Sequence, residues 1–315
     1  MTRFHCIDDH VPPETVGLLR DACLARGIEF CLWDARSFDF RPDRRAAAGD
    51  LLYRPAVSHA AHTVERHLHV PGVADFYVMP DGVFFPFAGG LALHQRLGVS
   101  CPAAIPCHTN DPRLLRAFAE RLGGLPLVVK VPGLSGGIGV MRVDSLAALY
   151  SLIDYLVAQG TATLLTAYVP DATHWRVVVI GNDAVAAYRN HVADGDFRGS
   201  PSDADEDYLA EVPAAVADLA VRSVHAERVE FGGVDLLEDV NGQLYLLEVN
   251  YPCYFAHAQL GAGWTSRAAW SHICRPRRPA EHGGSCWVQG GAAGWRTVAS
   301  GCDQAPCPGA VRRLR

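Results

Sequence analysis

The feature that most constrains this chain is a glycine-rich loop between two short apolar runs. Four glycines fall within residues 133–139, and Lys130 stands just before the loop. Each glycine in an ordered segment lowers the stability of the fold by about 0.5–1 kcal/mol relative to alanine, so a favourable interaction must offset this cost. Backbone amides that close on an anion can supply it. The sequence therefore predicts a strand over 127–130, an anion-binding loop and a second strand over 140–143.

Lys130 is also the only lysine in a chain with 27 arginines. A compact ammonium on a flexible stem suits a place among phosphate oxygens, where a planar guanidinium is less adaptable. The loop is not a Walker A motif, and strand-like residues follow it where a dinucleotide fold would begin a helix. This favours a flap over nucleotide phosphates. Two alternatives stay open: arginine-biased codon usage that left one lysine by accident, and a surface hairpin that binds nothing.

Composition narrows the class of protein. The 315 residues are 49% hydrophobic and 20% charged, which is typical of a soluble globular protein. A net charge of −6 argues against nucleic-acid binding, and no apolar run is long enough to predict a membrane span. The first residues lack the apolar core of a signal peptide, and ten scattered cysteines form no close framework. We therefore expect a cytoplasmic protein with reduced thiols that binds neither nucleic acid nor membrane. The sequence does not indicate an oligomeric state.

The pattern of elements indicates an α/β protein with α+β parts, in four regions. Residues 1–88 alternate strand and helix, which predicts a small parallel sheet. Residues 89–160 hold the glycine loop, and residues 161–272 are mostly strands. Residues 273–315 are rich in glycine, proline and arginine, and we expect this tail to be largely disordered. Its four cysteines match no standard zinc spacing. The expected helices are 14–26, 59–68, 89–97, 111–122, 145–158 and 214–225, and the other expected strands are 28–33, 50–53, 163–169, 175–180, 184–189, 230–238 and 243–250.

A hairpin near the end of the third region brings two carboxylates together. Asn241-Gly242 is a strong signal for a two-residue turn. Such a turn places Asp235 directly opposite Glu248, with Asn250 two residues further along the same face. The other face is apolar and is expected in the core: Val234, Leu236, Leu247 and Val249.

Two facing carboxylates repel by up to ~4 kcal/mol at 4 Å with an effective dielectric near 20. A cation bound between Asp235 and Glu248 would turn this repulsion into a net attraction. The hard oxygens of these two residues and of Asn250 are suitable ligands for Mg²⁺. The alternative is a solvent-facing polar side of an edge hairpin. A three-residue turn would put the two carboxylates on opposite faces and remove the argument.

A second hairpin, over residues 175–189, carries arginines. A turn of even length at Gly181-Asn182 leaves Arg176 and Arg189 on a common face, and Arg198 follows shortly after. Guanidinium groups there would bind a triphosphate or a carboxylate substrate and stabilise transferring charge. Ordinary surface arginines are the alternative.

Together these segments resemble the ATP-grasp superfamily, and most closely the branch of RimK-like carboxylate–amine ligases. The resemblance spans about residues 85–265. The segments that carry it are Lys130 with its loop, Trp175-Arg176-Val177-Val178-Val179-Ile180-Gly181, Asp196-Phe197-Arg198, Gly233-Val234-Asp235-Leu236-Leu237 and Leu247-Glu248-Val249-Asn250.

The resemblance implies an ATP-grasp fold, with a small N-terminal α/β domain and two lobes that clasp MgATP, with Mn²⁺ as a second candidate metal. It implies ligation of a carboxylate to an amine, which are small molecules or a peptide or protein terminus, through an acyl phosphate. The nucleotide would contact Lys130, Gly136, Gly137, Gly139, Thr166, Tyr168, Val169 and Arg176. The metal ligands would be Asp235, Glu248 and Asn250, and Arg189 and Arg198 would face the acyl phosphate or the substrate.

The chain also departs from the family pattern. Ala167 stands where the family carries an acidic residue beside the adenine, and His174 stands where it carries an aspartate. The second phosphate-side lysine, expected near Phe87, is missing, and Gly199-Ser200-Pro201-Ser202-Asp203 follows Arg198 where the family often has an asparagine and a glycine pair. These departures leave two alternative functions open. One is a degenerate, regulatory ATP-binding protein, and the other is a kinase of the same fold that acts on a hydroxyl.

Overall fold

The computed structural model describes residues 2–73, 75, 98–131, 136–201, 207–209 and 211–255, together with two short strands in the tail. The chain divides into two compact units, Met1–Arg275 and Pro276–Arg315. The second unit is described through the antiparallel strands β14 (Cys286–Val288) and β15 (Arg296–Val298). The expectation that residues 273–315 are largely disordered stays a prediction, and these two strands are what the structure describes of the second unit. The expected helix over 89–97 lies outside the described residues, as does the position near Phe87.

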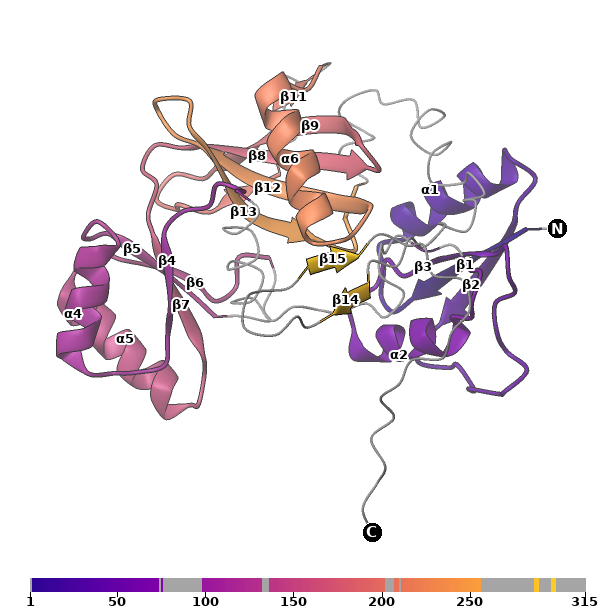
Figure 1. Ribbon diagram of the computed structural model, residues 1–315, viewed down its shortest axis with the longest axis horizontal. Coiled ribbons are helices and arrows are strands. Elements are labelled where there is room, and N and C mark those ends of the chain that lie inside the picture. Colours follow the sequence, from indigo (N-terminus) through magenta and orange to yellow (C-terminus); the bar gives the residue numbers. More distant parts are fainter. Residues whose placement is uncertain are drawn as a thin grey trace, which may run out of the picture. The chain divides into compact units, whose positions relative to one another are not determined.

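The N-terminal sheet of the first unit has three parallel strands in the order β2-β1-β3 (Figure 1). Its elements are β1 (Arg3–Asp8), α1 (Pro13–Leu24), β2 (Glu29–Asp34), β3 (Leu51–Tyr53) and α2 (His59–Leu68). Phe4 and Cys6 cluster with residues of α1, and Ile7 clusters with residues of α2, so one helix covers each face. The predicted parallel sheet is confirmed. The sequence did not predict strand β1, because Arg3, His5 and Asp8 interrupt its apolar run.

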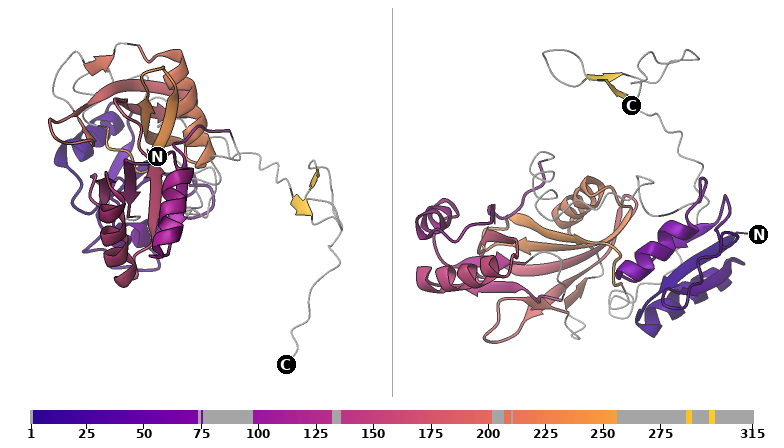
Figure 2. Two further views of the ribbon diagram at one scale, coloured as in Figure 1. Left: turned by 90° about the vertical axis from the view of Figure 1, so that its left-hand side faces the viewer. Right: turned by 90° about the horizontal axis from the view of Figure 1, so that it is seen from below.

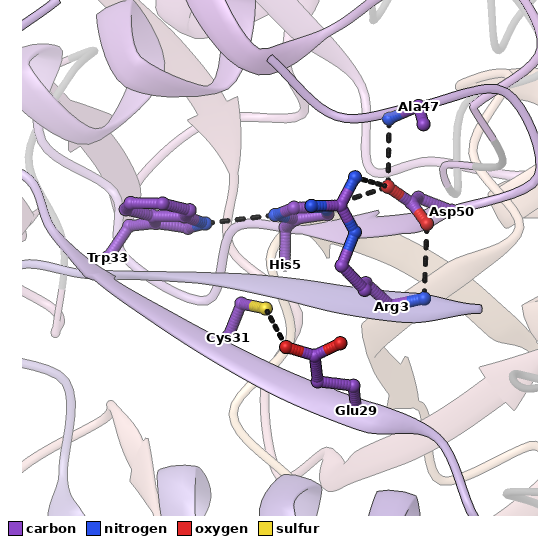
Figure 3. A network of polar contacts seen from close by, with 7 residues as sticks. All are labelled: Arg3, His5, Glu29, Cys31, Trp33, Ala47 and Asp50. Atoms are coloured by element: carbon purple, nitrogen blue, oxygen red, sulfur yellow. Dashed lines mark hydrogen bonds and ion pairs between the residues drawn. The ribbon is translucent and has the colours of Figure 1, made fainter. Parts of the chain in front are cut away.

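A buried polar network lies within this sheet (Figure 3). Its central residue, His5, is two positions from Ile7 in β1, so both side chains lie on the same side of the strand. His5 Nε2 lies 3.0 Å from Asp50 Oδ2, and the Trp33 indole donates to His5 Nδ1 at 2.9 Å. An indole N–H can only donate, so Nδ1 accepts and the imidazole is neutral with its proton on Nε2. Both ring nitrogens are therefore occupied, and the network is structural.

The second sheet has four antiparallel strands in the order β4-β7-β5-β6. Its elements are β4 (Ala104–Cys107), α4 (Pro112–Arg121), β5 (Leu127–Lys130), β6 (Val140–Val143), α5 (Leu146–Ala158) and β7 (Thr163–Ala167). Both helices start at a side-chain cap, because Asp111 accepts from the Arg113 amide and Ser145 from the Ala148 amide. The helices pack together on one face of the sheet (Figure 2). Strand β7 pairs with β4 and β5, so the lobe continues past the boundary expected at 160/161.

The third sheet follows the path β10-β9-β8-β12-β13, with β11 also paired to β9. Its elements are β8 (Thr173–Ile180), β9 (Asp183–Val192), β10 (Gly199–Ser200), β11 (Tyr208–Leu209), α6 (Ala214–Ala226), β12 (Phe231–Glu238) and β13 (Leu244–Asn250). One face, with Trp175, Val177 and Val234, packs against α6. The other face carries Val178 and Phe231, which cluster with Phe4 and Tyr53 of the N-terminal sheet. We call this second side the site face, because the candidate functional residues lie on it.

Among the residues that the structure describes, no helix combines the length and the apolar character needed to cross a membrane.

Candidate active site

Asp235 and Glu248 are direct partners across β12 and β13, as predicted. The turn, however, differs from the prediction. Asp239 pairs with Gln243, so three residues form the loop, with Gly242 at φ +78°. The ladder then shifts between Asp235 and Leu236, where Leu247 is an extra residue in β13. This β-bulge restores the pairing that a three-residue loop alone would have lost. The three-residue loop itself pairs Leu246, instead of Leu247, with Leu236 and so places Leu246 in the core.

Asn250 joins the two carboxylates. Its amide nitrogen donates to Asp235 Oδ2 at 2.9 Å and to Glu248 Oε1 at 3.0 Å. Arg176, the partner of Asp235 on β8, places Nε 2.7 Å from Asp235 Oδ1. Burial raises the pKa of Asp235 to about 7; Arg176 lowers it, and Glu248 adds to the rise. The site therefore concentrates carboxylate oxygens in a poorly solvated place, where negative charge is costly.

This donor set fits a hard cation. It has two carboxylates and one amide, and Asp235 Oδ1, which faces the Arg176 guanidinium, is buried with no aligned hydrogen bond among the described residues. The amide of Asn250 can turn its oxygen to the same point, because the two amide positions exchange by rotation. The part of the chain that the structure describes holds no group of three or more His, Cys, Asp or Glu side chains placed for a metal. A cation here would thus rely on Asp235, Glu248 and Asn250, with further oxygens from a bound phosphate.

Lys130, at the end of β5, shares an electrostatic environment with these carboxylates. Burial lowers the pKa of its ammonium, while Glu248, Asp235 and Cys101 act in the opposite direction. Such coupling requires the groups to be near one another. Residues that are more than one hundred positions apart therefore converge: the ammonium from the second sheet and the carboxylates from the third.

The glycine loop needs its glycines for their backbone angles. Gly136, Gly137 and Gly139 have φ values of +65°, +75° and +76°, in the region that other residues avoid. Gly133 lies outside the described residues. The loop is tied to β5 by the Val131 amide, which donates to the Gly139 carbonyl at 2.9 Å. Arg198 Nη1 donates to the Gly137 carbonyl at 3.2 Å. Arg198 is therefore placed at the glycine loop.

The segment after β7 lies beside the same region. Tyr168 packs edge to face with Phe197 at 6.4 Å, and Arg142 of β6 lies 4.5 Å from the centre of the Tyr168 ring. Thr166 is buried in β7, with its hydroxyl oxygen unpartnered among the described residues. Val169 follows the strand and is half-buried. Tyr168 thus contacts Phe197, the residue immediately before Arg198.

Arg189 does not join this site, and the prediction of a common face with Arg176 is wrong. The turn at Gly181-Asn182 has the expected two residues, with Ile180 opposite Asp183. A bulge at Val185 then shifts the ladder, so Arg176 pairs with Tyr188 and Arg189 pairs with Trp175. Arg189 stacks on the Trp175 ring at 5.1 Å, on the α6 face of the sheet.

Two residues that the sequence analysis did not assign lie on the site face. His174 pairs with Asn190, two positions along the strands from the Arg176–Tyr188 pair. Asn190 Oδ1 is buried and has no hydrogen bond among the described residues. The departure from the family pattern at residue 174 was the one signal in the sequence. Asn190 carried none, because only the bulge at Val185 turns it to this side.

Comparison with known proteins identifies the family. Residues 94–258 match the RimK-like ATP-grasp domain, which is about half of the chain. The chain belongs to this RimK-like ATP-grasp family. The fold and the family expected from the sequence are confirmed.

Two curated relatives illustrate the similarity. A probable alpha-L-glutamate ligase from Enterobacter sp. (strain 638) is 30% identical over 162 residues, which cover 51% of this chain and 53% of the relative. The ribosomal protein bS6–L-glutamate ligase of Salmonella paratyphi B (strain ATCC BAA-1250 / SPB7) shows the same identity and coverage. The match therefore spans about half the length of these relatives.

Solved structures extend the fold comparison to more of the chain. The ATP-grasp ligase PsnB, complexed with a phosphomimetic variant of its minimal precursor, Mg and ADP, aligns with a TM-score of 0.65 at 17% identity. That alignment covers 87% of this chain and 98% of the other. The D-alanine–D-alanine ligase of Bacillus anthracis aligns with a TM-score of 0.59 at 17% identity, over 87% and 95%. At these identities the likeness establishes the fold.

Proposed function

We propose that this protein is an ATP-dependent carboxylate–amine ligase that forms an amide or peptide bond through an acyl phosphate. The observation that carries the proposal is the convergence of Lys130 with the Asp235–Glu248–Asn250 group, beside a loop of positive-φ glycines. An ammonium, a cation site and free loop amides are what a triphosphate needs. The named relatives, which are glutamate ligases, support the same reaction class.

In this proposal the chain acts mainly by binding and orientation. A carboxylate oxygen of the substrate attacks the γ-phosphorus of ATP, the bond to the β-phosphate oxygen breaks, and ADP leaves. The amine nitrogen then attacks the acyl carbon, and phosphate leaves as the amide forms. Lys130 and Arg198 neutralise charge on the phosphates, and the glycine loop excludes water. Asp235, Glu248 and Asn250 would hold Mg²⁺, which supplies charge neutralisation between the phosphate oxygens when it is bound.

We propose an amino acid or a peptide or protein terminus as the amine, and a small carboxylic acid or a peptide carboxylate as the donor. Glutamate is the first substrate to test, because the curated relatives are named as glutamate ligases. The PsnB structures with precursor support testing a peptide next. Mn²⁺ remains the second candidate metal, and a cytoplasmic location stays a prediction.

The test is mass spectrometry of reactions that contain MgATP, mixed amino acids and peptides. Wild-type protein is compared with Glu248→Ala and with Glu120→Ala, an exposed glutamate of α4 that serves as the matched control. We expect a condensed product with wild type and Glu120→Ala and none with Glu248→Ala. Equal product from all three proteins would refute the metal assignment.

Hydroxylamine in place of the amine tests the intermediate. It should trap the acyl phosphate as a hydroxamate while ADP is released. A stable phosphorylated product without any amine would favour the kinase. Binding of MgADP with no turnover under any of these conditions would favour the regulatory protein.

A further inference from the structure

Gly199 marks an unusually close contact with the sheet. Its φ is outside the left-handed region, so the backbone angle does not require a glycine. Space does: a Cβ at this position would lie 2.8 Å from His174 Nδ1 and 3.0 Å from Asn190 Cβ. Both distances are below ordinary van der Waals contact. The backbone at residue 199 therefore rests directly on the His174–Asn190 pair.

The residue before it, Arg198, is held by separate contacts. Arg198 Nη1 donates to the Gly137 carbonyl at 3.2 Å, and a Cβ on Gly137 would lie 3.3 Å from Arg198 Cδ. Asp196 accepts from Arg198 Nη2 at 2.8 Å and fixes the rest of the guanidinium. The side chain of Arg198 thus contacts the glycine loop, while the next residue, Gly199, packs against His174 and Asn190.

Phe197 adds a third contact through its packing on Tyr168. The segment from Asp196 to Gly199 is short, and its far end pairs with β9 through Gly199 and Val192. Its position is therefore set by that backbone pairing and by the group against which Gly199 packs. That group is the imidazole of His174, a half-buried ring whose Nδ1 is the closest atom.

We propose that His174 is a positioning residue. It holds the 196–199 segment in the position from which the Arg198 side chain contacts the glycine loop, beside the nucleotide phosphates. The inference rests on the proposed function for the role of Arg198. An aspartate at 174, as in the family pattern, would be smaller and would add negative charge next to Arg198. Burial lowers the pKa of His174, so the ring here is neutral and acts by its bulk. Asp196 then remains the carboxylate that pairs with Arg198.

Four variants test the contact. His174→Ala removes the ring, while His174→Asn keeps an atom at the place of Nδ1. Gly199→Ala pushes the segment off the ring, and Gly17→Ala is the control, because a Cβ there would meet none of the described residues within 4 Å. The first readout is the rate of tryptic cleavage after Arg198, followed by mass spectrometry in nucleotide-free protein. The second is the Kd for MgADP, measured by calorimetry on the whole chain. Circular dichroism verifies that each variant is folded.

We expect His174→Ala and Gly199→Ala each to speed cleavage after Arg198 severalfold and to weaken MgADP binding by about tenfold. His174→Asn and Gly17→Ala should behave as wild type. The double variant His174→Ala/Gly199→Ala should be no worse than Gly199→Ala, because both changes break the same contact.

The proposal would be overturned if a folded His174→Ala protein kept the wild-type cleavage rate and MgADP affinity. It would also be overturned if His174→Asn were as impaired as His174→Ala, or if the two single effects multiplied in the double variant. Failure of the wild type to bind MgADP would count against the proposed function. In that case the cleavage rates still decide whether His174 positions the segment.

Discussion

Arg176 Nε lies 2.7 Å from Asp235 Oδ1, so a carboxylate of the proposed cation site is already paired with an arginine on the neighbouring strand. The two atoms are close but not aligned as a hydrogen bond, and both count as buried. The pair offsets one of two facing negative charges, which would otherwise be costly in this poorly solvated place. Asp235 Oδ2 and Glu248 remain turned towards Asn250. Arg176 therefore makes a two-carboxylate site tolerable before any cation binds.

Gly233 keeps this ion pair in place, and replacing it should weaken the cation site. A Cβ at 233 would lie 2.7 Å from Arg176 Nη1 and 2.9 Å from the buried Cys253 Sγ. The Cys253 sulfur is enclosed, so Gly233→Ala should displace Arg176 from Asp235. We expect a loss of about 1–3 kcal/mol in the free energy of unfolding. We also expect weaker Mg²⁺ binding, measured by calorimetry.

The neighbouring glycine supplies the control. A Cβ at Gly232 would meet Val249 and Val224 at 3.1 and 3.2 Å, on the α6 face of the same strand. Gly232→Ala should therefore reduce the free energy of unfolding without a specific effect on Mg²⁺ affinity. An equal loss of Mg²⁺ affinity in both variants would mean that displacement of Arg176 is not the cause.

Lys130 should be a selective target for amine-reactive reagents. It is the only lysine of the chain, and burial lowers the pKa of its ammonium, which raises the fraction of free amine at a given pH. An N-hydroxysuccinimide ester at mildly alkaline pH should label Lys130 and the α-amino group, as read by peptide mass spectrometry. MgADP should protect Lys130 and leave the α-amino group unaffected. Labelling of Lys130 that is indifferent to MgADP would place this lysine away from the nucleotide.

Arg189 and Arg198 should behave differently, although the sequence alone assigns them one role. Arg198 contacts the glycine loop, whereas Arg189 stacks on Trp175 at the α6 face. Arg198→Ala should weaken MgADP binding by about tenfold. Arg189→Ala should leave the Kd unchanged and lower the free energy of unfolding by about 0.5–1 kcal/mol, the usual size of an exposed cation–π contact. Calorimetry and urea unfolding measure the two effects. A larger loss of affinity in Arg189→Ala would restore the sequence-based assignment.

These two arginines show where prediction from sequence stops. Element boundaries follow from local signals, so the α2, β5, β6 and α5 segments begin and end within a residue of the predicted bounds. The face to which a strand residue points depends on register, which one extra residue reverses. No residue type marks Val185 or Leu247 as a bulge, and the energy that selects a bulge lies in contacts between distant segments. The sequence therefore predicted the right elements for both hairpins but could not determine their register.

The two bulges had opposite effects on the predicted site. In the β12–β13 hairpin a longer turn and a bulge compensate, and Asp235 still faces Glu248. In the β8–β9 hairpin the turn was predicted correctly, and the bulge alone moves Arg189 off the site face. Asn190 takes a place on that face instead, opposite His174, which shares the face of Arg176 by strand alternation. The pairing of Asp235 with Glu248 was thus predicted correctly but from the wrong turn length. Of the two arginines predicted to share a face, only Arg176 lies on the site face.

The network around His5 should make the N-terminal sheet sensitive to acid. Burial lowers the pKa of His5, and protonation of Nδ1 would break the bond from Trp33. Burial alone would raise the pKa of Asp50, but hydrogen bonds from Ala47, His5 and Arg3 lower it from 3.8 to about 2. Both folded-state pKa values lie below those of the unfolded chain. The unfolded state therefore binds more protons, and the free energy of unfolding falls as the pH falls.

The expected profile has two parts. Below pH ~6.5 stability declines as the unfolded chain protonates His5, and between pH ~4 and ~2 the protonation of Asp50 removes about 2 kcal/mol more. Asp50→Asn should lower stability at neutral pH and lose the second part, whereas Asp43→Asn, which changes a largely exposed carboxylate, should retain both. Urea unfolding followed by tryptophan fluorescence across this range measures the profile. If the acid profile of Asp50→Asn matched that of the wild type, the network could not be what stabilises this sheet, because removing its central acceptor would have changed nothing that depends on protons.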